Sequence, residues 1–362
     1  TRVRWFSGST RWLDTEKSRS ENNKIKVLFF GSDSFSVPHL EALIAAKNQP
    51  GSIIERIDVV SPRERTKKSK RDAEDSKTHG LKTFASPDRQ TGFDSWTFPS
   101  DEAVDAWDVG VVVSFGWFLP DDVIRRFKKA GINVHPSLLP KYRGSAPLQR
   151  AILNDDKTTG VTVQLLDPNE FDAGKILAQA QVDVPQNPLP TYKSLEALLA
   201  KKGGELVVDV VCNFDERKRD SKAQDPSMVT KANKISREAC KAQWSKWDAA
   251  RVERLYRATG FRFPITALWT VQGLEPKSLP ISLYDITLVQ NQDNSTDSES
   301  SQTTTVLPGT IFYDRPSQTL QIVCADGARI GVGAVQFEGK KKLLAKDFFN
   351  GYHVHSGISQ FL

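Results

Sequence analysis

Three polar side chains in one region of the sequence could together carry out chemistry on a carbonyl group. Asn133 and His135 lie two residues apart in Gly131–His135, an expected strand, so their side chains should point to the same face. Asp172 follows in an Asp-Ala-Gly turn after a later expected strand. When an amine attacks a formyl carbonyl, the amide and the imidazole can stabilise the oxyanion, and the carboxylate can orient the imidazole or take the amine proton. The trio therefore fits formyl transfer, but its spacing alone does not identify the reaction.

Alternating strands and helices are expected to hold this trio in an α/β fold with an open, mostly parallel, Rossmann-like sheet. Lys26–Phe30, a tight turn and Val37–Ala46 are read as the first strand, turn and helix. The valines of Asp108–Phe115 form a continuous run, which is typical of a strand buried on both faces. Sheets of this kind bind ligands at the carboxyl ends of their strands, where His135 would lie. The other expected elements are strands at Ile54–Val60 and Val161–Leu166 and helices at Pro120–Lys129, Leu148–Asn154 and Leu195–Phe214.

Several other kinds of site are not expected. The first turn holds one glycine, Gly31, instead of the spaced glycines of a dinucleotide fingerprint, so no NAD site is predicted. Cys212, Cys240 and Cys324 are far apart and form no Cys-x-x-Cys pair, so neither a disulfide framework nor a metal centre is expected. No apolar run reaches the roughly 18–20 residues that a membrane span requires, and we expect no membrane partner.

The composition and the expected secondary structure of the chain change after Leu195–Phe214, the last helix expected in the first domain. Glu216–Asp225 is highly charged, and a linker is predicted at 216–227. Short β-like segments separated by turns follow, which favours a small antiparallel barrel, resembling an OB fold, in 228–362. Asn291–Thr305 is polar and of low complexity, so a disordered loop is predicted at 291–305. The expected order is thus a catalytic domain at 24–215, the linker and the barrel.

The first residues, 1–23, are predicted to be a leader that precedes the folded chain. Basic residues dominate the first twenty positions, with serine, threonine and tryptophan between them and two acids, Asp14 and Glu16. This composition is typical of the end of a mitochondrial presequence. We therefore expect localisation to the mitochondrial matrix and no contribution of this leader to the fold.

Positive charge is concentrated in two further parts of the chain, whose formal net charge is +6 over 362 residues. In 228–290, ten Lys and Arg residues stand against five Asp and Glu residues. The densest run follows the second expected strand and is defined here as the basic insert: Arg63, Arg65, Lys67, Lys68, Lys70 and Arg71. Because neutralising phosphates is the main sequence-independent source of nucleic-acid affinity, the basic insert is predicted to bind RNA. A small barrel is also a common platform for nucleic acids.

The motifs around the trio give a more specific indication. They are Asn133-Val-His135-Pro-Ser-Leu-Leu-Pro140, Arg143-Gly144, Ala146-Pro147-Leu-Gln149-Arg150, Gly160-Val-Thr162 and Asp172-x-Gly174. Together they resemble the 10-formyltetrahydrofolate-dependent formyltransferase family. The stretches FFGSDSFSVPHLEAL, SFGWFLP, KAQWSKWDAARVERLYRA and EGKKKLLAKDFFNG are similar to the members that use methionyl-tRNA as acceptor. The resemblance covers about 24–362, nearly the whole chain.

This resemblance implies that Asn133, His135 and Asp172 are the catalytic residues and that no metal takes part. The implied formyl donor is 10-formyltetrahydrofolate, and the implied acceptor is the amino group of methionyl-tRNA, used in mitochondrial translation initiation by a monomeric enzyme. The acceptor would be gripped by the basic insert. The residues implied to bind the donor are Ser137, Leu138, Leu139 and Pro140, together with Val111–Leu119, which includes Phe115 and Gly116.

The chain departs from the family pattern at two places. Pro136 stands where many relatives have glycine, and Asp167–Phe171 replaces a glycine-containing stretch before the aspartate. Both could alter the geometry of their loops.

Two alternatives remain open at the level of sequence. One is a formyltransferase with the same core that acts on a small amine, for which no basic insert would be expected. The other is an RNA-binding protein that keeps the fold but has no catalytic activity. The presence of Asn133, His135 and Asp172 argues against this alternative.

Overall fold

The computed structural model describes residues 24–62, 80–88, 90–99, 107–271, 277–289 and 306–362. The chain forms two compact units, and each is described by itself. The first comprises the N-terminal part through Pro147 together with 158–183 and 196–232, and the second comprises 148–157, 184–195 and 233–362. The leader, the basic insert and the low-complexity loop at 291–305 lie outside the described residues.

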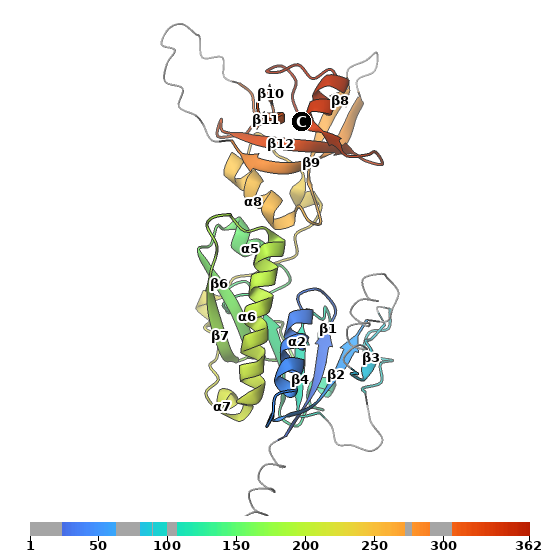
Figure 1. The fold of residues 1–362 in the computed structure, drawn as a ribbon, viewed down its shortest axis with the longest axis vertical. Helices are drawn as coiled ribbons and strands as arrows, with labels where there is room; N and C mark the ends of the chain where they lie inside the picture. The colour runs from blue at the N-terminus through green and yellow to red at the C-terminus, as the bar shows by residue number, and fades with distance from the viewer. Residues whose placement is uncertain (1–23, 63–79, 89, 100–106, 272–276, 290–305) are drawn as a thin grey trace, which may run out of the picture. The chain divides into compact units, whose positions relative to one another are not determined.

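A seven-stranded sheet forms the centre of the first unit (Figure 1). Its strand order is β3-β2-β1-β4-β5-β6-β7, and the first five strands in this order run parallel. The last two pairings, β5 with β6 and β6 with β7, are antiparallel. The strands are β1 (Ile25–Gly31), β2 (Ile54–Ser61), β3 (Thr83–Ala85), β4 (Val109–Val113), β5 (Ala130–His135), β6 (Thr158–Leu165) and β7 (Ile176–Asp183). The order reverses direction between β1 and β4, where open sheets of this type bind ligands beyond the strand ends.

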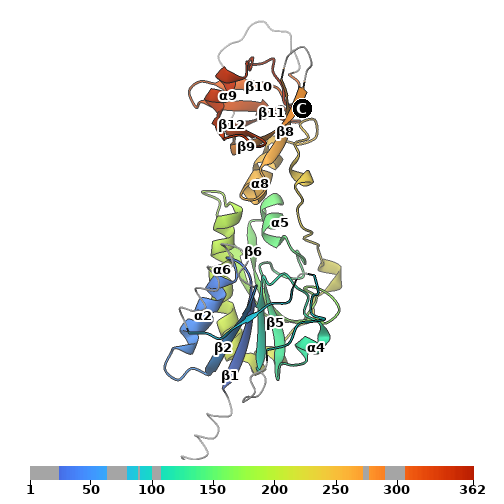
Figure 2. The ribbon, with the colours of Figure 1, turned by 90° about the vertical axis from the view of Figure 1, so that its right-hand side faces the viewer.

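Two helices, α2 (Val37–Lys47) and α6 (Tyr192–Cys212), lie side by side against one face of this sheet (Figure 2). Pro38 lies in the first turn of α2, where its missing N–H costs no helical hydrogen bond. The two helices can approach closely because Gly203 of α6, which has no side chain, lies against the ring of His39. A Cβ at Gly203 would lie 2.2 Å from His39 Nε2. α4 (Asp121–Ile124) lies on the other face.

A cluster of apolar and aromatic side chains fills that other face. Phe30, Val112, Trp107 and Phe127 belong to it and are all buried. The Phe127 ring lies where a Cβ of Gly110 would stand, at 2.4 Å, so this strand position has room for no side chain. The prediction of a helix over Pro120–Lys129 is wrong in its extent, since α4 ends at Ile124. The chain turns there, and Phe127 packs over Gly110.

The C-terminal unit contains a curled antiparallel sheet of six strands. Its main path is β10-β11-β12-β9-β8, with β13 paired to β12. The strands are β8 (Ile265–Val271), β9 (Lys277–Leu288), β10 (Ile311–Asp314), β11 (Thr319–Val323), β12 (Arg329–Phe337) and β13 (Leu343–Leu344). The predicted fold class, a mostly parallel α/β sheet followed by a small antiparallel barrel-like unit, is confirmed.

Helices α8 (Ala249–Thr259) and α9 (Ala345–Gly351) pack on this sheet. Asp248 caps α8 by accepting a hydrogen bond from the Arg251 N–H, which satisfies one of the free donors of its first turn. Val252 and Leu255 lie three residues apart on one face of α8 and join the buried core of the sheet.

The remaining elements connect these parts. They are α5 (Pro147–Leu153), α7 (Phe214–Arg219) and two 3-10 turns at Pro226–Met228 and Glu238–Cys240. The stretch predicted as a linker, 216–227, therefore includes the end of α7, and Gln224 within it is buried. The domain bounds 24–215 and 228–362 stay a proposal. Among the described residues, no helix is both long and apolar enough to cross a membrane.

Candidate active site

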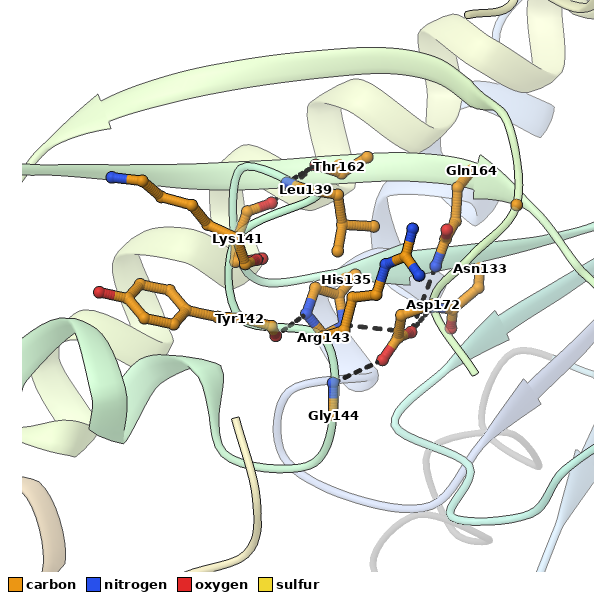
Figure 3. A network of polar contacts seen from close by, with 12 residues as sticks. Asn133, His135, Leu139, Lys141, Tyr142, Arg143, Gly144, Thr162, Gln164 and Asp172 are labelled. Atoms are coloured by element: carbon orange, nitrogen blue, oxygen red, sulfur yellow. Dashed lines mark hydrogen bonds and ion pairs between the residues drawn. The ribbon is translucent and has the colours of Figure 1, made fainter. Parts of the chain in front are cut away.

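Three hydrogen-bond donors and the His135 imidazole converge on the carboxylate of Asp172. Its Oδ1 accepts hydrogen bonds from Asn133 Nδ2 at 3.3 Å and Gln164 Nε2 at 3.2 Å, and it lies 3.4 Å from His135 Nδ1. Its Oδ2 accepts a hydrogen bond from the Gly144 N–H at 2.9 Å. Figure 3 shows Asp172 between Asn133, His135, Gln164 and Gly144. The structure thus brings together the three residues predicted to be catalytic.

The strands explain this convergence. Asn133 and His135 are alternate residues of β5 and both reach Asp172, as the strand period requires. β6 runs antiparallel beside β5 and places Gln164 opposite Asn133 and Thr162 opposite His135. Asp172 lies in the loop from β6 to β7 with φ of 57°, a left-handed conformation that few residues other than glycine adopt without strain.

The hydrogen-bond partner of His135 Nε2 determines which ring nitrogen carries the hydrogen. Nε2 lies 2.9 Å from the carbonyl oxygen of Tyr142, and a carbonyl oxygen can only accept. Nε2 therefore carries a hydrogen, and Nδ1, facing Asp172, is the nitrogen that can gain or lose a proton. The imidazole is buried, so Nδ1 faces the carboxylate and not solvent.

The loop between His135 and Gly144 is anchored by β6 and β7. The Thr162 hydroxyl donates to the Ser137 carbonyl at 2.7 Å and accepts from the Leu139 N–H at 3.1 Å. Gln179 Nε2 donates to the Leu139 carbonyl at 2.8 Å. Gly144 closes the loop at φ of 121°, where a Cβ would lie 2.9 Å from the Ala232 carbonyl oxygen. Its N–H can reach Asp172 because no side chain stands there.

An open cavity with about 420 Å³ of empty space lies beside the trio. One part of its wall is aromatic, and Phe118 and Phe171 form an edge-to-face pair there with ring centres 4.7 Å apart. Polar groups of Asn133 and Asp172 line another part, whereas His135 lies behind Asp172. The full lining is Val112, Trp117, Phe118, Leu119, Ile124, Asn133, Gln164, Leu165, Leu166, Asp167, Glu170, Phe171 and Asp172.

The residues predicted to bind the donor are only partly at this cavity. Val112 and Trp117–Leu119, from the expected segment Val111–Leu119, line it. Phe115 and Gly116 do not, and neither do Ser137, Leu138, Leu139 and Pro140. Within this loop, Ser137 and Leu139 are buried. We therefore expect the loop to shape the site through its backbone. Its contact with the donor stays a prediction.

Charged groups stand at the edge of the cavity. Glu170 lies 3.0 Å from Lys231 Nζ and 3.4 Å from Arg143 Nη1. The hydrogen bond from Lys231 and its positive charge lower the pKa of Glu170, with a smaller contribution from Arg143. Glu170 is therefore ionised near neutral pH and keeps the two basic side chains beside the site.

The sequence analysis missed several residues of this site. Gln164 had a detectable signal, since Thr162 and Gln164 are polar residues at alternate positions of an otherwise apolar strand. Phe171 lies in the segment that departs from the family pattern. Gln224 contacts the backbone of Asp172 from 52 residues away, and no local pattern indicates it.

Comparison with known proteins agrees with this fold. Residues 25–211 match the family described as formyl transferase, and residues 234–353 match the formyl transferase C-terminal domain. The chain therefore belongs to the formyl transferase family, and the resemblance expected from the motifs is confirmed.

Among its relatives, the chain is similar to proteins named methionyl-tRNA formyltransferase. The mitochondrial protein of Bos taurus is 37% identical over 96% of this chain and 83% of that protein. The protein of Methylococcus capsulatus is 29% identical over 91% of this chain and 97% of that protein.

Two solved structures share the fold at low sequence identity. HypX from Aquifex aeolicus in complex with tetrahydrofolic acid has a TM-score of 0.54 and 14% identity, over 91% of this chain. The chain spans 47% of that protein. An N-formyltransferase from Helicobacter canadensis with folinic acid and dTDP-3-aminofucose has a TM-score of 0.55 and 16% identity, over 85% of this chain and 98% of that protein.

Proposed function

We propose that this chain transfers the formyl group of 10-formyltetrahydrofolate to the amino group of methionyl-tRNA, in the mitochondrial matrix, for translation initiation. The chemistry rests on the convergence of Asn133 and His135 on Asp172 beside an aromatic cavity. The acceptor rests on the likeness to methionyl-tRNA formyltransferases over both domains, including mitochondrial ones.

The cavity fits a folate-type donor. A reduced pterin with its aminobenzoyl ring has flat faces and polar edges. Trp117, Phe118 and Phe171 offer ring surfaces, and Asn133 and Gln164 offer amide groups. The bound donor supplies the activated formyl carbon, which the wall would hold beside Asn133 and Asp172.

The residues of the chain then act on charge and on a proton. As the amine nitrogen bonds to the formyl carbon, negative charge grows on the formyl oxygen. Asn133 Nδ2 has two hydrogens and gives one to Asp172, so the second is available to stabilise that oxygen.

The attacking amine must lose a proton, and the leaving nitrogen of the folate must gain one. Asp172, which lines the cavity, takes the first proton, and His135 Nδ1 at 3.4 Å shares it. The pair then returns a proton to the leaving nitrogen when its bond to the formyl carbon breaks. The number of protons in the site is unchanged over the cycle.

The test is formylation by the purified chain. Charged methionyl-tRNA and small amines, namely amino sugars and glycinamide ribonucleotide, are each offered with 10-formyltetrahydrofolate. Formylation of methionyl-tRNA with little reaction of the small amines supports the proposal. Preferred reaction with a small amine would contradict the acceptor, and no reaction with any amine would contradict the enzyme assignment.

A further inference from the structure

A buried carboxamide from the connecting segment reaches the site. Gln224 lies between the two matched family domains, 25–211 and 234–353, and is 9% exposed. Its Oε1 accepts a hydrogen bond from Arg143 Nε at 2.9 Å. Its Nε2 shares two hydrogens among three acceptors, namely Gln164 Oε1 at 3.1 Å and the carbonyl oxygens of Asp172 at 2.8 Å and Gly174 at 2.9 Å.

The chemistry of these partners allows one orientation of the Gln224 amide. A guanidinium can only donate, so Oε1 must face Arg143, and carbonyl oxygens can only accept, so Nε2 must face them. Gln164 then turns its Oε1 to Gln224, which leaves its Nε2 facing Asp172 Oδ1 at 3.2 Å. Arg143 thus fixes the orientation of the Gln224 amide, which in turn fixes the orientation of the Gln164 amide beside the Asp172 carboxylate.

We propose that Gln224 is a positioning residue for formyl transfer, which acts by fixing the Gln164 amide so that its NH2 group, and not its oxygen, faces Asp172. This inference rests on the proposed function, because it takes Asp172 as the group that moves the proton. A flipped Gln164 amide would place an oxygen against Asp172 Oδ1, and the repulsion would move the carboxylate away from Asn133 and His135.

The rest of the connecting segment supports this role. The Arg143 N–H donates to the Thr230 carbonyl at 2.9 Å, and the Ala232 N–H donates to the Arg143 carbonyl at 2.7 Å. The segment from Gln224 to Ala232 therefore lies along the loop that carries Gly144, the donor to Asp172 Oδ2. The catalytic unit includes this segment, which lies outside both matched domains.

Four variants of the full chain test the relay: Gln224→Glu, Gln224→Leu, Gln164→Leu and the double variant Gln224→Glu with Gln164→Leu. In Gln224→Glu the new carboxylate still accepts from Arg143 but cannot donate, so the Gln164 amide turns around. We expect kcat to fall by about 100-fold, the scale of a misplacement of about 1 Å. Gln224→Leu and Gln164→Leu should each lower kcat by about 10-fold, since each removes hydrogen bonds around Asp172 without placing an oxygen against its carboxylate. In the two Gln224 variants the KM values for the folate donor and for methionyl-tRNA should change by less than about threefold, because Gln224 does not line the cavity.

The double variant decides between positioning and a merely structural role. If the turned amide of Gln164 causes the loss, then removing it should return kcat of the Gln224→Glu protein to the level of Gln164→Leu alone. A merely structural role predicts that the two losses add. Additive losses, or wild-type kcat in the Gln224 variants, would overturn the inference. Gln181→Leu, at an exposed glutamine of β7, is the matched control and should be unaffected.

One further measurement and a fallback keep the test decisive. The ¹⁵N resonance of His135 Nδ1 should shift in Gln224→Glu and return in the double variant, and this readout needs no substrate. An unmoved resonance overturns the inference. If Gln224→Glu does not fold, a normal kcat in Gln164→Leu overturns it and a 10-fold loss supports it. A wild-type chain that cannot formylate methionyl-tRNA contradicts the proposed function instead.

Discussion

The Nδ1 atom of His135 lies 3.4 Å from Oδ1 of Asp172, while Nε2 of the same ring donates to the Tyr142 carbonyl. The two contacts give the imidazole one fixed hydrogen and one exchangeable one. The exchangeable position faces the carboxylate that lines the cavity. In the proposed reaction, a proton taken from the acceptor amine is therefore shared between the two groups without leaving the site.

Replacing the carboxylate should remove turnover without unfolding the protein. In Asp172→Asn the side chain keeps its shape, but one carboxylate oxygen becomes an NH2 group that faces other donors and cannot take a proton. We expect kcat for formylation of methionyl-tRNA to fall by at least about 100-fold, the scale for loss of acid–base assistance. His135→Ala should have a loss of the same size. Asp183→Asn, at an exposed carboxylate of β7, should keep normal kcat. Near-normal turnover in the Asp172 or His135 variant would refute the assignment.

The aromatic wall should contribute to binding of the donor. Phe171 is 58% exposed and its ring meets Phe118 at the edge of the cavity. Loss of one ring contact is worth about 0.5–1.5 kcal/mol, so Phe171→Ala should weaken binding of a folate analogue by up to about 10-fold. Titration calorimetry measures this directly. Ile358→Ala, at an exposed residue outside the site, is the control, and equal affinities in all three proteins would contradict the role of the wall.

The Thr162 hydroxyl should stabilise the loop after His135. Thr162→Val keeps the shape of the side chain but leaves the Leu139 N–H without this acceptor and the Ser137 carbonyl without this donor. An unsatisfied buried polar group costs about 1–3 kcal/mol, and the free energy of unfolding should drop by about that amount. Urea denaturation of the variant, compared with Thr158→Val at the exposed start of β6, gives the measurement. Equal stability of the two variants would show that the loop does not depend on this hydroxyl.

His39 should make stability depend on pH. Burial between the helices lowers the pKa of His39 to about 4, although the hydrogen bond to the Phe35 carbonyl opposes the shift. In the unfolded chain its pKa is about 6.5, so between pH 6.5 and 4 the unfolded state holds the extra proton. Stability is therefore complete above pH 6.5 and falls by about 3 kcal/mol as the pH drops to 4.

The His39→Leu variant isolates this contribution. Its free energy of unfolding should vary less with pH between 6.5 and 4 than that of the wild type, by up to one proton, or about 1.4 kcal/mol per pH unit. His353→Leu, at an exposed histidine, should keep the wild-type slope. If His39→Leu also keeps that slope, His39 does not titrate in this window.

The basic insert should govern the affinity for tRNA. Replacing Lys67, Lys68 and Lys70 with alanine should raise KM for methionyl-tRNA and leave binding of the folate analogue unchanged. Each phosphate contact that is lost should make the log–log salt dependence of tRNA binding shallower by about 0.7–0.9. Lys193→Ala combined with Lys201→Ala, on the exposed side of α6, removes two positive charges elsewhere and should leave KM and the salt dependence unchanged. An unchanged KM for methionyl-tRNA and an unchanged salt dependence would indicate that the C-terminal domain, and not the basic insert, binds the tRNA.

The sequence by itself determined the parts of this protein that depend on neighbouring residues. Alternation along Gly131–His135 placed Asn133 and His135 on one face, and the continuous valines of β4 indicated a buried strand. Both are local, because a strand repeats every two residues whatever it packs against. The change from long helices to short strands likewise predicted two kinds of fold in the chain. The antiparallel direction of β6 and the short extent of α4 were not local, since they depend on β5 and on the space above Gly110.

The tertiary structure alone decided how the site is completed. Gln224 bonds to Asp172 across 52 residues, and Phe171 meets Phe118 through a loop that departs from the family pattern. These contacts depend on the path of whole segments, and many paths are compatible with the same local sequence. A buried amide also takes its orientation from all of its partners at once, so the direction of the hydrogen bonds around Asp172 exists only after Arg143, Gln164 and Gln224 have been brought together.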